Sequence, residues 1–335
     1  MSSAAIVILN YNGREMLETF LPSVIANSHV DIWVIDNSSS DDSIPFLEEK
    51  FPQIQVLKSS QNLGFAGGYN WGLDQLRNKY DFHILLNSDV EVTKNWDNDL
   101  VRALEGMPDY AAIQPKILSW TSKNKFDYAG AGGGFVDGYG YPYCRGRIMD
   151  QIEQDSGQYD DSIDVDWASG ACFIVRSVVF QQFEGFDASF FAHMEEIDLC
   201  WRMRKSGWKI GYKGDISVYH LGGGTLQRSS PQKLYLNIRN SLSMIYKNES
   251  AANFKKIYWV KYLLEHLAIL SYLIKGQKEL AKAIRKGYDD FDSAKSSLCK
   301  FQSAISKEQE IKSKSPVTFL VWHWAVLRKK KFSAF

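Results

Sequence analysis

An apolar run, Phe82–Leu86, ends abruptly in the small polar residues Asn87, Ser88 and Asp89. A buried parallel strand reads as a short continuous apolar run, and open α/β sheets bind ligands at the carboxyl ends of such strands. Asp89 is therefore expected at the mouth of a crevice on that edge of a sheet. A carboxylate there could hold a hard divalent cation, and the cation could hold a diphosphate.

Two earlier strand-like segments also end in polar residues. Asn10 and Asn12 follow the first segment, and Asp36 and Asn37 follow the second. At such strand-to-helix turns a carboxylate and backbone N–H groups could hold a base and a ribose. Alternatively, Asp36 simply caps a turn.

The segment Asn62–Asn70 is rich in glycine and precedes a helical pattern. A glycine-rich turn that opens a helix offers N–H groups and the positive end of a dipole to an anion. The segment lacks the Gly-Lys-Ser/Thr of a Walker loop and the first-strand position of a dinucleotide fingerprint. A purely structural turn explains it equally well.

Glu195, Glu196 and Asp198 cluster at the expected start of a helix. Glu195 and Asp198 are three residues apart and so share a helical face, whereas Glu196 points about a quarter-turn away. Such carboxylates are often only partners of the helix dipole. In an apolar pocket, burial would instead raise the pKa of one of them toward neutrality and make it a general base. His220 ends another short strand and is either structural or a partner of Asp89.

The first 120 residues alternate short apolar runs with helical patterns. We expect strands at Ala4–Leu9, Asp31–Asp36, Ile54–Lys58, Phe82–Asn87 and Ala111–Leu118, and helices at Arg14–Asn27, Asp41–Phe51, Gly68–Lys79 and Trp96–Glu105. This alternation predicts a parallel sheet with helices on its faces.

Beyond residue 118 the pattern changes. Residues 119–160, rich in Gly, Tyr and Asp, are predicted to be a long loop region with room for a hairpin. We expect a strand at Val165–Val175, a helix up to Ser206, strand pieces near Lys209–Tyr212 and Ile216–Tyr219, and helices from about residue 232 to a last one at Val317–Arg328.

The net charge of the 335 residues is zero, but the charges are unevenly spread. Residues 1–250 contain 22 Lys or Arg and 32 Asp or Glu, whereas residues 251–335 contain 17 and 7. This asymmetry predicts a basic segment that meets an anionic surface. The chain opens without a signal-like segment, and its four cysteines have no metal-type spacing, so we expect a cytosolic protein with reduced thiols.

The longest apolar stretch, Ile257–Ile274, contains Lys261, Glu265 and His266. These polar residues argue against a simple spanning helix and favour an interfacial one. Cations and aromatic residues also alternate in Lys255–Leu264 and from Val317 to Lys331, a pattern typical of segments on an anionic membrane surface. The alternative is that these helices pack on the catalytic domain or form a dimer.

Taken together, these segments resemble the family 2 glycosyltransferases with a GT-A fold, in particular the rhamnosyltransferase-like branch. The matching segments run in family order over roughly residues 4–245: Ile6–Gly13, Asp36–Asp41, Asn62–Asn70, Leu85–Asp89, Ser169–Cys172, Gly185–Asp187, Glu195–Arg202 and His220. The resemblance implies a GT-A domain at residues 1–245, with a mostly parallel Rossmann-like sheet flanked by helices. A basic, aromatic-rich helical region would follow at residues 246–335.

The resemblance also implies roles for individual residues. The expected binding residues for a UDP- or dTDP-sugar donor are Asn10, Asn12, Asp36, Asn37, Gly64, Gly67, Asn70, Asn87 and Ser88. Asp89 and His220 would bind Mg²⁺ or Mn²⁺, and Asn87 stands where the family has its first metal-motif acid. Glu196 aligns with the catalytic base but is Glu where the family has Asp, so Glu195 stays an alternative and Asp198 a supporting residue. The expected residues on the acceptor or diphosphate side are Trp167, Gly170, Arg202 and Arg239.

The implied reaction is an inverting transfer to a hydroxyl of a saccharide or lipid-linked saccharide in cell-surface polysaccharide synthesis. We expect the protein to be peripheral at the cytoplasmic face of the plasma membrane, with no nucleic-acid partner. Two alternatives stay open: a nucleotidyltransferase that makes an activated sugar, and an inactive membrane-associated sugar-binding scaffold. The Gly-rich, Arg/Lys-containing loop of the first alternative is missing after the first strand, whereas Asn87 and Glu196 favour the second.

Overall fold

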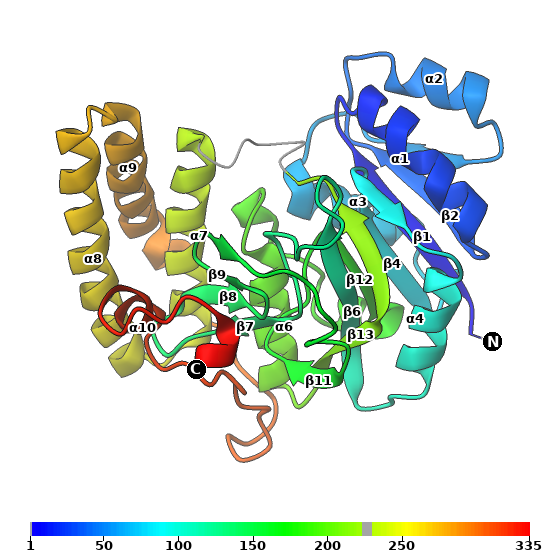
Figure 1. Ribbon diagram of the computed structural model, residues 1–335. Helices are drawn as coiled ribbons and strands as arrows, with labels where there is room; N and C mark the ends of the chain where they lie inside the picture. Colours follow the sequence, from blue (N-terminus) through cyan, green and yellow to red (C-terminus); the bar gives the residue numbers. More distant parts are fainter. Residues whose placement is uncertain (1, 223–229) are drawn as a thin grey trace.

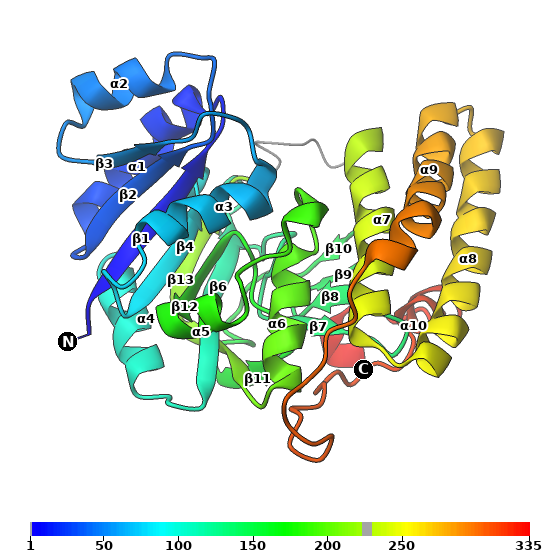
Figure 2. The same ribbon diagram turned by 180° about the vertical axis from the view of Figure 1, so that it is seen from behind.

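The computed structural model describes residues 2–222 and 230–335 (Figures 1 and 2). In this part of the chain, nine strands form one mixed sheet with the order β11-β13-β6-β12-β4-β1-β2-β3, and β5 pairs with β13. Its strands are β1 (Ala4–Asn10), β2 (Asp31–Asp36), β3 (Gln55–Lys58), β4 (Phe82–Asn87), β5 (Val90–Val92), β6 (Tyr110–Ser119), β11 (Ser162–Val165), β12 (Cys172–Arg176) and β13 (Lys209–His220). The helices of the same region are α1 (Arg14–Asn27), α2 (Ser43–Lys50), α3 (Gly64–Gln75), α4 (Trp96–Glu105), α5 (Ser177–Gln182), η1 (Ala188–Phe190) and α6 (Glu195–Lys205).

The N-terminal strands are parallel and covered on both faces. β1 pairs in parallel with β2 on one side and with β4 on the other. Ile6 and Ile8 of β1 join the hydrophobic cluster that contains Leu17 of α1. Ala5 and Val7 point to the other face and join the cluster of α3. Because both faces are buried, these strands read as continuous apolar runs, which is why the sequence predicted them well.

The glycine-rich helix α3 begins at Gly64, four residues before its expected start. Its glycines are packing positions, since a side chain at Gly68 would meet Leu9 and one at Gly72 would meet Ile35. The segment expected to be a turn is therefore largely inside the helix, where it lets α3 approach the sheet closely.

The prediction of a loop at residues 119–160 was wrong in part. A second, antiparallel sheet with the order β10-β9-β8-β7 forms here, from strands too short to produce a sequence period. Its strands are β7 (Gly134–Val136), β8 (Pro142–Cys144), β9 (Arg147–Ile148) and β10 (Gln151–Ile152). The expected strand Val165–Val175 is in fact the end of β11 and the start of β12. The two expected pieces at residues 209–219 are one strand, β13, with a register shift between Lys213 and Ser217.

Three long helices pack beside the sheet region, as Figures 1 and 2 show. The C-terminal elements are α7 (Pro231–Asn248), α8 (Ala251–Ile274), α9 (Lys278–Ala294), η2 (Lys295–Ser297), α10 (Leu320–Ala325) and η3 (Phe332–Ala334). The domain boundary expected at residue 245 falls inside α7. The last helix, α10, is shorter than the predicted Val317–Arg328, and after it the chain returns to the small sheet, where Phe332 stacks on Phe135.

Candidate active site

The polar ends of β1, β2 and β4 meet at one edge of the sheet, as their parallel registers require. Asn10 pairs with Asp36, and Leu9 pairs with Asn87. The Asn10 Nδ2 donates to Asp36 Oδ1 at 3.1 Å and to Ser39 Oγ at 3.1 Å. Asn10 Oδ1 is buried and accepts no hydrogen bond from the described residues. It is a polar atom of the expected donor site that is left for a ligand.

The turns that follow β1 and β2 are tied to each other. Asp36 Oδ2 accepts a hydrogen bond from Ser39 N at 3.0 Å, and Asn12 Oδ1 accepts one from Ser40 N at 2.7 Å. Asn37 is 2% exposed, and its Nδ2 donates to the Gly64 carbonyl at 2.9 Å. The side chains of Asn12, Asp36 and Asn37 therefore hold these turns together with hydrogen bonds.

The start of α3 is not a free anion site. The N–H of Gly64 donates to the Asn62 side chain at 2.8 Å, and the N–H groups of Phe65 and Ala66 donate to the Phe191 carbonyl at 2.7 and 3.1 Å. Gly67 lies inside the helix. Because the protein itself occupies the N–H groups at positions 64–66, the structure does not support the expected role of this segment in holding a phosphate.

Asn70, another expected donor residue, is occupied as well. Its Nδ2 donates to the Phe186 carbonyl at 2.7 Å, and its Oδ1 accepts from Phe186 N at 2.9 Å. The amide therefore fastens α3 to the segment that precedes η1. Ser88 lies nearer to the edge itself, since a methyl group placed on Gly13 would come within 3.8 Å of Ser88 Oγ.

The expected metal ligands, Asp89 and His220, lie side by side. His220 Nε2 is 3.2 Å from Asp89 Oδ1 and 3.5 Å from Asn87 Nδ2. The pairing of β5 with the end of β13 places His220 opposite Val90, and so brings together two residues 131 positions apart. Both side chains are largely buried, at 7% exposed for Asp89 and 5% for His220.

Asp127 is a third member of this cluster, and it was not among the residues predicted from the sequence. His220 Nδ1 is 3.2 Å from Asp127 Oδ2, and Ala129 N donates to the same oxygen at 2.6 Å. Asp127 is 1% exposed, and its Oδ1 has no hydrogen-bond partner among the described residues. It lies in the segment at residues 119–160, which has no regular hydrophobic pattern from which its position could be predicted.

The electrostatics of the cluster favour a charged imidazole. Burial lowers the pKa of His220, but the charge of Asp89 and the hydrogen bond to Asp127 outweigh burial and raise it to about 10. Burial also raises the pKa of Asp89, yet the charge and the hydrogen bond of His220 bring it below its ordinary value. In this form of the site, an imidazolium lies between two carboxylates.

The donor atoms of this cluster fit Mn²⁺ or Mg²⁺. Asp89 offers a carboxylate oxygen and His220 offers Nε2 once the proton has left, while Asp127 would keep the Nδ1–H and so fix the tautomer. Within residues 2–222 and 230–335, no group of three or more His, Cys, Asp or Glu residues is arranged to hold a metal by itself. The fit therefore needs further oxygen ligands, which a diphosphate would supply.

The second expected centre, the pair Glu195 and Glu196, opens α6 from a strained loop. Phe191, His193 and Met194 have positive φ values of 64°, 71° and 73°, which non-glycine residues rarely adopt. Asn240 of α7 holds this loop, since its Nδ2 donates to the carbonyls of Phe190, Ala192 and His193 at 2.9, 2.9 and 2.8 Å.

Both glutamates are poised to hold a proton. Burial raises the pKa of Glu195 well above 4.5, and the charge of Glu196 adds to the effect. Burial also raises the pKa of Glu196. The Oε2 atoms of both residues are buried and have no hydrogen-bond partner among the described residues. Two adjacent carboxyl groups, each with one buried oxygen that has no partner among these residues, have the chemistry that a general acid–base pair requires.

Gly170 connects the glutamate pair to the sheet edge. A methyl group placed on Gly170 would lie 3.8 Å from Glu196 Oε1 and 3.2 Å from the ring of Phe65. The neighbouring Ala171 carbonyl accepts from Asn87 N at 3.0 Å. Glu196 is thus joined through residues 170–171 to the strand end that carries the metal-binding candidates.

Asp198 and Arg202 support α6. Asp198 is fully buried and accepts from Arg202 Nε at 2.8 Å, Lys247 Nζ at 3.0 Å and Asn248 Nδ2 at 2.8 Å. Arg202 also donates to the carbonyls of Phe183 and Gly185 at 2.7 and 2.9 Å. These hydrogen bonds attach α6 to α7 and to the segment that follows α5, so Asp198 and Arg202 have a structural role here.

Trp167 and Arg239 likewise serve neighbouring backbone. Trp167 Nε1 donates to the Phe135 carbonyl at 3.0 Å, and the indole packs on Gly134. Arg239 Nη2 donates to the carbonyls of Ser189 and Phe190, both at 3.0 Å. Arg239 therefore joins its neighbour Asn240 in holding the loop before the glutamate pair.

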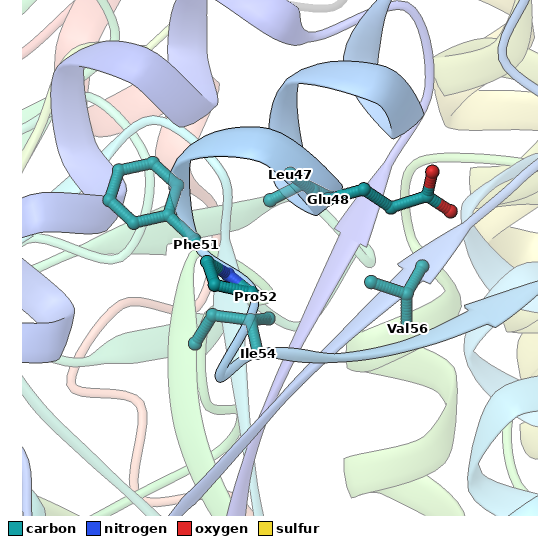
Figure 3. A pocket seen from close by; sticks show the side chains of 6 residues that line it. All are labelled: Leu47, Glu48, Phe51, Pro52, Ile54 and Val56. Atoms are coloured by element: carbon teal, nitrogen blue, oxygen red, sulfur yellow. The ribbon is translucent and has the colours of Figure 1, made fainter.

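A small cavity of about 170 Å³ lies elsewhere, between α2 and β3 (Figure 3). It is lined by Leu47, Glu48, Phe51, Pro52, Ile54 and Val56. The Glu48 carboxylate is already paired with Lys58 at 2.7 Å, and the other lining side chains are apolar. The cavity contributes no residue to the cluster described above.

Comparison with known sequences points to one family. The family described as "Glycosyl transferase family 2" matches residues 5–147. The hexosyltransferase Agl10 of low-salt glycan biosynthesis in Haloferax volcanii is 25% identical over 245 residues, which are 72% of this chain and 74% of that protein. N-acetylglucosaminyl-diphospho-decaprenol L-rhamnosyltransferase of Mycobacterium tuberculosis is also 25% identical over 245 residues, covering 64% of this chain and 75% of its own.

Solved structures share the fold. GalNAc-T7 with UDP, GalNAc and Mn²⁺ has a TM-score of 0.59 at 15% identity, over 90% of this chain and 58% of that one. TarS of S. aureus with UDP-GlcNAc has a TM-score of 0.56 at 14% identity, over 87% and 81% of the two chains. At these identities the likeness establishes the fold alone, and it confirms the predicted mostly parallel sheet with flanking helices.

Proposed function

We propose that this protein is a metal-assisted, inverting glycosyltransferase, because its residues 5–147 match glycosyl transferase family 2. Its donor would be a UDP- or dTDP-sugar, and its acceptor a hydroxyl of a saccharide or lipid-linked saccharide. The observation that supports the proposal is that Asp89 and His220, from distant parts of the chain, lie 3.2 Å apart. Gly170 and Ala171 lie between Glu196 and Asn87, the residue that ends β4.

In the proposed reaction the two centres have different roles. Asp89 and His220 would hold the metal, and Asp127 would orient the imidazole of His220. The bound metal would neutralise charge on the leaving diphosphate. Glu196 would take the proton of the acceptor hydroxyl, whose oxygen attacks the anomeric carbon from the opposite face. The bond from the anomeric carbon to the diphosphate oxygen breaks, and its electron pair leaves with the nucleotide.

Relatives guide the choice of substrates. The name of the tuberculosis relative specifies an acceptor on diphospho-decaprenol, and the TarS structure contains UDP-GlcNAc. We propose by analogy that the acceptor of this enzyme is lipid-linked and that the product enters a cell-surface polysaccharide. We also propose a cytoplasmic site of action at the plasma membrane, in keeping with four cysteines that are free thiols.

The test combines a panel of UDP- and dTDP-sugars with Mn²⁺ and a synthetic polyprenyl-diphosphosaccharide. We expect acceptor-dependent release of UDP or dTDP, loss of release in EDTA, and a product whose anomeric configuration, read by NMR, is opposite to that of the donor. Retained configuration would disprove inversion, and full activity in EDTA would disprove the metal. Pyrophosphate turnover would indicate a nucleotidyltransferase, and donor binding without turnover would indicate a scaffold.

A further inference from the structure

Helix α8 buries a charged pair beside its apolar contacts and exposes a row of large apolar side chains. Its inner face buries Lys261, at 2% exposed, and Glu265, at 8%. Its outer face exposes Leu263, at 62%, and Ile274, at 78%. The outer residues follow a helical spacing and form what we term the α8 stripe: Trp259, Leu263, Leu267, Leu270 and Ile274. A surface helix normally directs its apolar side inward, so this outer face is suited to an apolar environment.

The buried charges fix the rotation of α8. Lys261 Nζ is 3.0 Å from Glu265 Oε1 and 3.7 Å from the centre of the Tyr141 ring. Tyr288 of α9 donates to Glu265 Oε2 at 2.7 Å. Because this pair loses its partners if α8 turns about its axis, the α8 stripe is held facing away from the protein.

A second apolar patch lies close to one end of the stripe. Figures 1 and 2 show α10 beside the end of α8 at which residue 251 lies. Around α10, Trp322 is 52% exposed and Leu327 is 49% exposed. The exposed cations Arg328, Lys330 and Lys331 follow directly. Of the large hydrophobic side chains exposed in the described part of the chain, eleven of fourteen lie between Trp259 and Leu327.

A basic cavity adjoins the same end of the stripe. Its volume is about 420 Å³, and its lining residues are Tyr246, Ala251, Phe254, Lys255, Tyr258, Trp259, Lys295 and Lys300. Trp259 belongs to both the cavity and the stripe. Lys300 donates to the Glu249 carbonyl at 3.1 Å, and Lys295 is 3.9 Å from Asp292. Three ammonium groups among aromatic rings suit the phosphate of an amphiphile whose chains extend along the stripe.

We propose that the α8 stripe, the α10 patch and this cavity together dock the protein onto an anionic membrane, with the lysines at lipid phosphates and the stripe at the acyl boundary. Residues 251–335 contain 17 basic and 7 acidic residues, which complements an anionic surface. A second copy is a poorer occupant, because it would bring two strongly cationic faces together. The inference rests on the proposed function in one respect: docking would bring the active site close to a lipid-linked acceptor in the membrane.

The docking is peripheral. By length and composition alone, α8 could cross a membrane. Its inner face, however, is bound to α9 and to the small sheet through Lys261, Glu265 and their tyrosines. A spanning helix would have to expose this charged pair to lipid or carry its polar neighbours with it.

The experiment is flotation of the full chain with phosphatidylcholine vesicles that contain 0 or about 30% phosphatidylglycerol, in low and high salt. We expect binding that needs the anionic lipid and weakens with salt. The substitutions Leu263→Glu and Leu270→Glu together should abolish binding, and Lys255→Gln with Lys300→Gln should weaken it by about fivefold per lysine. Val178→Glu, at a residue 71% exposed on α5, is the matched control and should bind like the wild type.

Several outcomes would overturn the inference: binding unaffected by the stripe variant, equal binding to neutral vesicles, resistance to carbonate extraction, or a dimer that the stripe variant converts to a monomer. Circular dichroism and thermal melting establish that each variant is folded. Transfer to a water-soluble acceptor analogue provides a separate measurement, because the stripe variant should keep it. Loss of vesicle binding with retained transfer therefore tests docking alone, whereas a wild type without any transfer contradicts the proposed function.

Discussion

At the scale of single residues, the proposed chemistry depends on a carboxyl pair with raised pKa values. Glu196 Oε1 lies beside Gly170, and its Oε2 has no hydrogen-bond partner among the described residues. Glu195 is 3% exposed, and burial together with the charge of Glu196 raises its pKa. Replacing Glu196 by Gln keeps the shape and removes the base.

We predict that Glu196→Gln lowers the transfer rate by about 10²–10⁴-fold and leaves donor affinity largely unchanged. The reason is that a positioned base acts on the acceptor, not on the nucleotide. Single-turnover kinetics and donor titration measure the two quantities. Glu195→Gln is the comparison: if that variant alone loses transfer, the base is Glu195.

The raised pKa of the pair predicts the pH profile. Burial shifts the titration of Glu196 upward from 4.5, so the base is protonated, and inactive, over a wider acidic range than an exposed glutamate. We expect kcat/KM to rise with pH through an apparent pKa above 4.5 that belongs to the pair. Rates that stay constant down to pH 4.5, with the fold intact by circular dichroism, would contradict this prediction.

Asp127 is expected to act through His220. Loss of the carboxylate that orients a metal-binding imidazole typically costs about 10–100-fold in metal affinity. We predict a weakening of this size for Asp127→Asn, measured directly by the electron paramagnetic resonance of free and bound Mn²⁺. Asp160→Asn is the control, because Asp160 pairs with Lys116 and belongs to the same segment without touching His220. Equal Mn²⁺ affinity in the two variants would remove the positioning role.

At the scale of elements, α7 holds the loop that delivers the glutamate pair. Asn240 bridges three carbonyls of that loop, and Arg239 bridges two. The loop contains three non-glycine residues with positive φ. Such strain persists only where surrounding contacts hold the conformation in place. Here the contacts come from one turn of α7, which carries Arg239 and Asn240.

We predict that Asn240→Ala lowers the free energy of unfolding by about 2–3 kcal/mol, since each lost neutral hydrogen bond contributes about 1 kcal/mol. It should also reduce kcat by about 10–100-fold, because the glutamates lose their fixed position. Urea unfolding and initial rates measure the two effects. Asn253→Ala on the exposed part of α8 should leave both unchanged. A variant that is stable but slow would show that positioning is separate from stability. A fully active variant would refute the positioning role of Asn240.

At the scale of the whole molecule, the C-terminal helices are attached through buried polar groups as well as apolar ones. Lys261 and Glu265 form a buried pair completed by Tyr141 and Tyr288. Removing one member of such a pair typically costs about 3–5 kcal/mol, because the other charge stays buried without compensation.

We therefore expect Glu265→Leu to destabilise the fold by about that amount. The double variant Lys261→Met with Glu265→Leu should recover part of the loss, because no isolated charge remains. Thermal and urea unfolding of both variants provide the measurement. A single variant as stable as the wild type would show that water reaches Lys261 in solution.

The sequence by itself determined the sheet edge. Continuous apolar strands ending in Asn10, Asp36 and Asn87 fix both the element type and the edge at which those residues meet, because parallel strands buried on both faces have one readable pattern. The ordered motifs also predicted the resemblance to the family 2 glycosyltransferases, which the match of that family to residues 5–147 supports. Neither inference needed contacts between distant residues.

Only the tertiary structure decided which polar groups are already engaged. The N–H groups of the α3 start bind Phe191, Asp198 and Arg202 bind each other, and Asp127 reaches His220 from an aperiodic segment. The outward direction of the α8 stripe likewise depends on the buried Lys261–Glu265 pair. Hydrogen-bond partners and burial are set by packing between elements far apart in the chain, and local patterns do not encode them.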